Sequence, residues 1–118
     1  MRIDLNEYDI SWVCDGEKIT VSGDYIDAVY DNKLDRVTAL EFSSVSFFDK
    51  KGTLLFIVDF IFNALGASIY CLANESVYEA KTVRVVIAHE PPFKGERFWQ
   101  HDINLENGSV SEPITKWR

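Results

Sequence analysis

Apolar and polar residues alternate along most of this chain with the two-residue period of β-strands. Near the N-terminus, Ile10 and Trp12 fall in phase before a turn at Asp15-Gly16, and a two-residue turn there places them opposite Val21 and Ile19. Both facing pairs are apolar and share one face, which is the agreement that a correct register requires. The pattern therefore predicts a β-hairpin.

The middle of the chain predicts two more strands. Between Arg36 and Phe48 the apolar positions change from even to odd numbers, which predicts one strand with a β-bulge near Ser43-Ser44. After the loop 49–52, the segment Thr53 to Phe62 is apolar on both faces, apart from Asp59. Such a strand is typical of the centre of a sheet or of a sheet covered on both sides.

The C-terminal half predicts further strands rich in Val, Ile, Tyr and Cys. Ser68 to Ala73 and Lys81 to Glu90 fit this pattern, and Pro91-Pro92 is expected to end the second of them. The residues between the two, 74–80, predict a loop or a short helical turn.

A last hairpin is predicted around Asn107-Gly108, a dipeptide that favours a tight β-turn. Its register places Leu105 opposite Val110, and His101 opposite Ile114. Pro113 on the return strand suits the edge of a sheet.

The segment Gly23 to Asp35 is compatible with two structures. As a helix, it gathers its apolar residues on one side and its aspartates on another. As a strand, it points Ile26, Ala28 and Tyr30 inward and ends in an Asn-rich turn. We favour the strand.

Counted together, the segments predict a mainly β fold of about seven or eight strands with at most one short helix. Short connections of this kind are typical of an antiparallel sandwich or a small barrel. The 118 residues are 47% hydrophobic and 26% charged, which is ordinary globular composition. We therefore expect residues 1–118 to form a single domain.

Negative charge is concentrated in the first third of the chain. Residues 1–41 contain ten acidic and four basic side chains, a net charge of −6 out of −7 for the whole chain. Such a distribution argues against nucleic acid or an anionic membrane as the partner and permits a basic protein partner. It also suits a role in solubility alone.

A membrane span and a secretory signal are both disfavoured. Leu54 to Leu72 is nearly long enough to cross a bilayer, but Asp59 near its centre would cost about 2.5 to 3.5 kcal/mol, and residues 63–66 read as a break. The N-terminus lacks a cationic start followed by an apolar run. We expect a cytoplasmic protein in which Cys14 and Cys71 are unbridged.

Asp59 is the sharpest single candidate, because it interrupts a long apolar run. A buried carboxylate requires a partner or a raised pKa. Asp59 is therefore a candidate buried functional carboxylate, with a satisfied structural aspartate or a half-exposed one as the alternative.

Histidine and cysteine offer weaker candidates. His89 and His101 fall in phase with apolar neighbours, so core histidines are the default and a shared catalytic or metal role is the alternative. The two cysteines and two histidines lack the short paired spacings of zinc sites. We find no phosphate loop, nucleophile elbow or calcium loop, and expect no metal, no cofactor and no catalytic residue.

The best candidate for a binding surface is acidic with aromatic anchors, a combination suited to fast capture of a cationic protein. Its members are Asp24, Tyr25, Asp27, Tyr30, Asp31 and Asp35. In size, acidity and absence of a catalytic motif, the chain resembles bacterial immunity proteins that block a cognate nuclease or other toxin. The resemblance concerns general character and transfers no residues. It implies inhibition by occlusion of a basic partner, without turnover.

Two other functions remain open at this point. A small-ligand carrier, such as a lipid-binding β-barrel, would use the many aromatic residues and Asp59 to line a cavity. An enzyme would require Asp59 and one of the two histidines to converge in one cleft.

Overall fold

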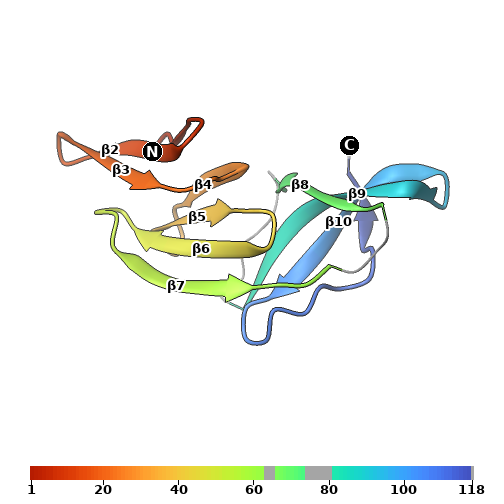
Figure 1. Ribbon diagram of the computed structural model, residues 1–118. Helices are drawn as coiled ribbons and strands as arrows, with labels where there is room; N and C mark the ends of the chain where they lie inside the picture. The colour runs from red at the N-terminus through yellow and green to blue at the C-terminus, as the bar shows by residue number, and fades with distance from the viewer. Residues whose placement is uncertain (63–65, 74–80, 118) are drawn as a thin grey trace. The chain divides into compact units, whose positions relative to one another are not determined.

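The computed structural model describes residues 1–62, 66–73 and 81–117. In that part of the chain every regular element is a β-strand, and the strands pair antiparallel, so the prediction of a mainly β fold is confirmed (Figure 1). No helix among these residues has the length and apolar character needed to cross a membrane.

Contacts divide the chain into two compact units, Met1–Ile57 and Val58–Arg118, and each is described by itself. The expected single domain stays a prediction. The first unit contains two sheets. One has the order β1 (Asp4–Leu5), β2 (Asp9–Cys14), β3 (Glu17–Ser22), and the other has the order β4 (Asp27–Asp31), β5 (Arg36–Leu40), β6 (Ser44–Asp49), β7 (Leu54–Asp59), with β7 running into the second unit. The remaining sheet has the order β11 (Thr115–Lys116), β10 (Glu96–Asn104), β9 (Thr82–Phe93), β8 (Ser68–Leu72). None of the sheets in the described residues closes into a barrel, so the sandwich is the correct alternative for the first unit.

The N-terminal hairpin has the predicted register. Strands β2 (Asp9–Cys14) and β3 (Glu17–Ser22) pair Trp12 with Ile19 and Ile10 with Val21. The turn residues Asp15 and Gly16 both have positive φ, 52° and 79°, as a type I′ turn requires. The short β1 (Asp4–Leu5) adds to the other edge of β2.

The segment between Gly23 and Asp35 is the strand that we favoured. It forms β4 (Asp27–Asp31), which pairs with β5 (Arg36–Leu40) and is an edge of its sheet. Asp31 ends the strand by accepting hydrogen bonds from the backbone N–H groups of Lys33 and Leu34, at 2.8 and 3.3 Å. Side-chain acceptors of this kind stabilise turns.

The single bulged strand predicted between Arg36 and Phe48 is wrong. The chain reverses after β5 and returns as β6 (Ser44–Asp49), with Leu40 opposite Val45 and the N–H of Glu41 donating to the carbonyl of Ser44 at 2.9 Å. The change of parity therefore marks a tight turn. The sequence did not indicate this turn, because the residue at its tip is the apolar Phe42, which is 64% exposed.

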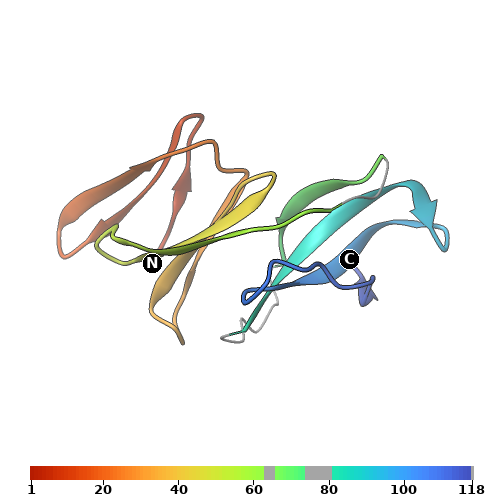
Figure 2. The same ribbon diagram turned by 60° about the horizontal axis from the view of Figure 1, so that its bottom comes forward.

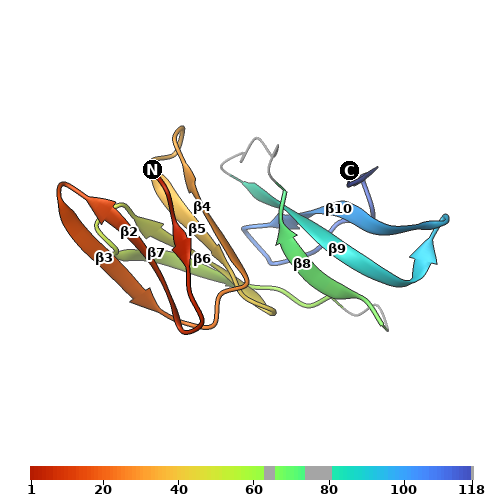
Figure 3. The same ribbon diagram turned by 90° about the horizontal axis from the view of Figure 1, so that it is seen from above.

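Two layers of strands form the core of the first unit, with β2 and β3 above the sheet of β4 to β7 (Figures 1 and 3). Ile10 and Trp12 pack there against the face of the second sheet that carries Val37, Ala39 and Phe48. Trp12 is 1% exposed, and its Nε1 donates to the carbonyl oxygen of Lys50 at 2.6 Å. The indole thereby joins the two sheets by both packing and a hydrogen bond.

Trp12→Phe should therefore lower the free energy of unfolding by about 2 kcal/mol, because it removes buried ring area and leaves the Lys50 carbonyl without its donor. The matched control is Trp117→Phe, since Trp117 contacts Tyr70 and Phe98 by ring edges and has no indole hydrogen bond among the described residues. We expect a loss of about 0.5 kcal/mol or less for the control. Equal losses in urea unfolding would contradict the role given to Trp12.

The strand β7 (Leu54–Asp59) is not the central or doubly covered strand that its composition predicts. It is an edge of its sheet, and Leu54, Leu55 and Ile57 are about half exposed, at 48%, 50% and 52%. Apolar residues on both faces show only the composition of a strand. The position of that strand in the sheet depends on how it pairs with strands that are distant in the sequence.

In the second unit, the long strands β9 (Thr82–Phe93) and β10 (Glu96–Asn104) form a hairpin flanked by β8 (Ser68–Leu72) and β11 (Thr115–Lys116) (Figure 2). The predicted stop at Pro91-Pro92 is wrong, because β9 continues to Phe93. From the pair Phe98↔Ala88 to the pair Glu96↔Phe93, β10 advances by two residues and β9 by five. The prolines lie in this bulge, where no ladder hydrogen bond is required of them.

The return from β10 towards the C-terminus contains a second irregularity. From the pair Ile103↔Val110 to the pair Gln100↔Thr115, β10 moves three residues and the return segment five. The predicted pairing of Leu105 with Val110 is therefore wrong by two residues. Beyond the extra residues, the register becomes the one expected for His101 and Ile114, because the pairs Gln100↔Thr115 and Trp99↔Lys116 belong to it.

Candidate functional site

The two histidines of the chain meet in the second unit. The Nε2 atom of His89 on β9 lies 2.9 Å from the Nε2 atom of His101 on β10. In a regular ladder they would be far apart, since His101 pairs with Val85, four residues or about 13 Å along the strand from His89. His89 directly follows Ala88, where the bulge of β9 begins, and bulges commonly redirect side chains in this way.

The hydrogen bonds of His101 determine the tautomer of each ring. Its Nδ1 atom lies 2.8 Å from the carbonyl oxygen of Ser111, which only accepts, so Nδ1 carries the proton. In the neutral ring, Nε2 of His101 is then an acceptor and Nε2 of His89 must donate to it. Nδ1 of neutral His89 is left as an acceptor without a partner among the described residues.

The geometry of the pair is that of a hydrogen bond. The ring planes differ by 16°, and the ring centroids lie 5.1 Å apart, close to the largest separation that a 2.9 Å contact between Nε2 atoms allows. The two Nε2 lone-pair directions therefore lie nearly along one line. Two ligands of a tetrahedral metal would instead converge on a third point, about 2.0–2.1 Å from each nitrogen.

Burial keeps both rings neutral. His101 is 1% exposed and His89 is half-buried. Desolvation lowers the pKa of His101, and the bond to Ser111 and the charges of Glu112 and Asp102 oppose this only in part. Desolvation also lowers the pKa of His89, and the neighbouring His101 lowers it further. At neutral pH the pair thus presents an acceptor at His89.

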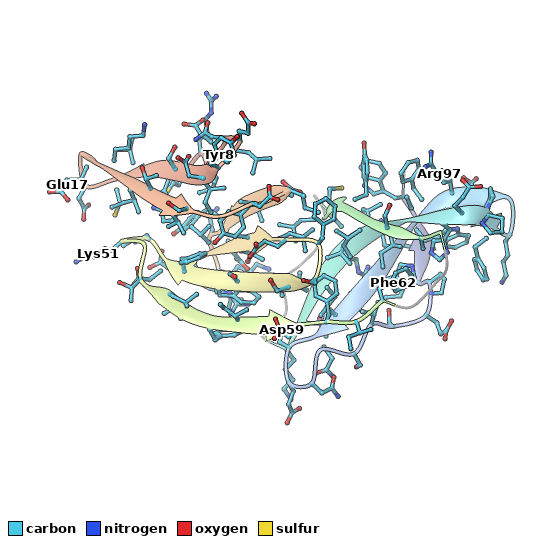
Figure 4. All side chains as sticks on the ribbon, in the orientation of Figure 1. Tyr8, Glu17, Lys51, Asp59, Phe62 and Arg97 are labelled. Atoms are coloured by element: carbon cyan, nitrogen blue, oxygen red, sulfur yellow. The ribbon has the colours of Figure 1, made fainter. Side chains whose placement is uncertain are left out.

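A pocket of about 350 Å³ lies beside this pair. Its lining comes from the chain after β7, from the bulge of β9 and from the extra residues of the C-terminal return: Ile61, Phe62, His89, Phe93, Val110, Ser111, Glu112 and Pro113. The ring of Phe62, which is labelled in Figure 4, lies near both histidines, with centroid distances of 6.2 Å to His89 and 5.7 Å to His101. The two irregularities of strand pairing thus build one concave site.

Ser111 anchors the wall of the pocket that the return segment forms. Its N–H donates to the carbonyl of Asp102, its Oγ accepts from the N–H of Asp102 at 2.8 Å, and its carbonyl holds His101. Asp102 is itself held by Arg84 at 2.9 Å. This network fixes the extra residues relative to the β9–β10 ladder.

The predicted acidic surface is placed along the edge strand β4, but not all its members are at the surface. Tyr25 lies in the core, 9% exposed, with its ring edge against Phe48, and Asp31 is 7% exposed. Asp24 and Asp35 are exposed, and Asp27 and Tyr30 are half-buried. The hydroxyl of Tyr30 donates to Asp35, which also lies 3.8 Å from the Nζ of Lys50.

Asp59 is exposed, so a buried carboxylate is the wrong one of the alternatives given for it. The physical reason is the edge position of β7, which lets this side chain reach solvent at the end of the strand (Figure 4). An exposed carboxylate needs no partner. A functional role for Asp59 stays a prediction.

Neither Cys14 nor Cys71 forms a disulfide, and both are half-buried. Among the residues that the structure describes, no three His, Cys, Asp or Glu side chains cluster as metal ligands would.

The sequence patterns identified both histidines as candidates, but they did not indicate the pocket or that Ser111 and Glu112 line it. The missed signal was the mismatch between Pro113 and a regular return strand, because proline in a strand often marks a bulge.

Comparison with family models, curated proteins and solved structures found no match to this chain.

Proposed function

We propose that the protein is an acidic binding protein, an immunity-type inhibitor that occludes the functional surface of a basic protein such as a toxin nuclease. The observation that supports this most directly is unneutralised negative charge in the first unit. Glu7, Asp15, Glu17 and Asp24 are exposed and have no ion pair among the described residues. Charge displayed in this way accelerates encounter with a cationic surface.

The edge of β4 is the part of this surface that we propose for contact. It combines Asp24 and Asp35 at its two ends with the half-exposed Asp27 and Tyr30 between them. Tyr25 and Asp31 act from inside: the Tyr25 ring packs in the core, and Asp31 shapes the turn that presents Asp35. We further propose that the protein acts in the cytoplasm, where cysteines without a disulfide, such as Cys14 and Cys71, are the ordinary case.

Charge reversal tests the proposal. Asp24→Lys should lower the association rate of the complex about tenfold at low salt and reduce its salt dependence, because an attractive charge becomes repulsive. Glu106→Lys is the matched control: it makes the same change of charge at an exposed carboxylate of the second unit without an ion pair among the described residues.

The partner is first identified by native mass spectrometry of the protein purified from its own cells at low salt. We expect a basic protein that dissociates as salt is raised, and then measure association rates of both variants with it. An acidic or neutral partner, or equal effects of the two substitutions, would refute the proposal.

A further inference from the structure

The pocket beside the two histidines presents acceptors from its polar side chains. The tautomers derived above leave Nδ1 of His89 with a free lone pair. The charged group in the described lining is the carboxylate of Glu112, which is exposed. The hydroxyl of Ser111 is already used, since it donates to the carbonyl of Glu112 and accepts from Asp102. A ligand that satisfies this lining must supply N–H or O–H donors.

The rest of the lining selects for an apolar body and a positive charge. Phe62 and Phe93 both contact His89, with ring centroids 6.2 and 5.9 Å from that of His89. Aromatic faces attract cations as well as apolar groups. The chain shows this preference itself, because Nζ of Lys94 lies 5.3 Å from the ring centroid of Phe93.

Nearby acidic side chains also favour a positive charge. Glu112, which is part of the lining, and Asp102 both raise the pKa of His101 against the larger effect of burial, which lowers it. A pocket of about 350 Å³ is near the lower limit for organic ligands and suits one aromatic ring or a short alkyl chain.

We propose that this pocket binds a primary ammonium group carried on a small apolar body, with the ammonium donating to Nδ1 of His89 and facing the Glu112 carboxylate. The same chemistry is found in a free arylalkyl amine and in the lysine side chain of a protein. This inference is independent of the proposed function, because it uses residues of the second unit only.

The test is an NMR titration that follows the imidazole Cε1–H resonances and the backbone amides at pH 7.5. The probes are 2-phenylethylammonium, 2-phenylethanol and 3-phenylpropanoate, which share a ring and chain but differ in charge. We expect the ammonium to bind at least about tenfold more tightly than the alcohol, with shifts at His89 and Phe93, and the carboxylate to bind weakest. Equal affinities for the three probes, or no shifts with the ammonium, would overturn the proposal.

Two carboxamide variants test whether the carboxylate of Glu112 is the charge that attracts the ammonium. Glu112→Gln should weaken ammonium binding about three- to fivefold, as expected for an exposed charge pair. Glu106→Gln removes an exposed carboxylate outside the pocket lining and should leave the affinity unchanged. Because both positions are exposed, both variants should fold. An equal effect of the two would overturn the proposal by showing that only net charge attracts the probe.

A fourth probe, Nα-acetyl-lysine N-methylamide, separates the two sources of the ammonium. If it binds as tightly as 2-phenylethylammonium, the pocket is suited to a lysine of a protein partner. If only the aryl amine binds, a free amine is the ligand. Either result supports an ammonium site.

Discussion

Gly108→Ala should lower the free energy of unfolding by about 3 kcal/mol or more, one of the two largest effects that we expect in this protein. Gly108 has φ of 74°, a conformation that disfavours any side chain. In addition, a Cβ at this position would overlap the backbone carbonyl oxygen of Asp59. The clash is with backbone rather than with a flexible side chain, so the chain must shift to relieve it.

Gly95→Ala is the matched control in the same unit. Gly95 has φ of 79°, but a Cβ there would meet no atom within 4 Å. Its cost should be about 1 kcal/mol, the conformational penalty alone. Urea unfolding of the two variants separates the cost of the backbone clash from the conformational cost of a positive φ. If Gly108→Ala is no more destabilising than Gly95→Ala, the close approach of the 104–109 turn to Asp59 is not a feature of the folded protein.

Acidification should destabilise the fold through the histidine pair, the second large effect. The folded protein holds both His101 and His89 at a lowered pKa, so the unfolded chain binds more protons as the pH falls through about 6.5. Stability is therefore complete above this pH and is lost on acidification towards the folded-state pKa. His101 contributes up to about 1.4 kcal/mol per pH unit in that window.

Protonation of both histidines is also incompatible with the contact between their Nε2 atoms. If both rings were charged, each Nε2 would carry a proton, and two donors would face each other across 2.9 Å. Urea unfolding at a series of pH values measures the slope, and NMR titration of the Cε1–H resonances measures the folded-state pKa values. A titration of either histidine at or above pH 6.5 in the folded protein would contradict this account.

Local patterns predicted what is local in this fold. The β2–β3 hairpin followed from the alternation of Ile10 and Trp12 and from an Asp-Gly turn, whose conformation only a few residues adopt. The strand β4 followed from its period and from the Asp31-Asn32 turn. The failures arose where the outcome depends on distant pairing. β7 has the composition of a central strand but is an edge, and no pattern within residues 53–62 contains that information.

The sequence indicated only part of the candidate site, again because the rest depends on how distant segments pair. His89 and His101 stood out because each lies in phase with apolar neighbours, but their contact requires β9 to depart from the ladder after Ala88. The prolines that accompany this departure were interpreted as the end of the strand. The acidic surface was predicted from residue types, acidic side chains with aromatic anchors, which do not distinguish the exposed Asp24 from the buried Asp31.

The two extra residues of the C-terminal return make the pocket a separable addition to the sheet. The β9–β10 ladder runs from Phe98 to Asn104 without them, and β11 pairs in the register that a plain hairpin would have had. Changes of chain length between Val110 and Thr115 can therefore rebuild or erase the pocket wall while the ladder persists. In evolutionary terms, insertion or deletion at this one short segment can reshape the pocket without changing the core.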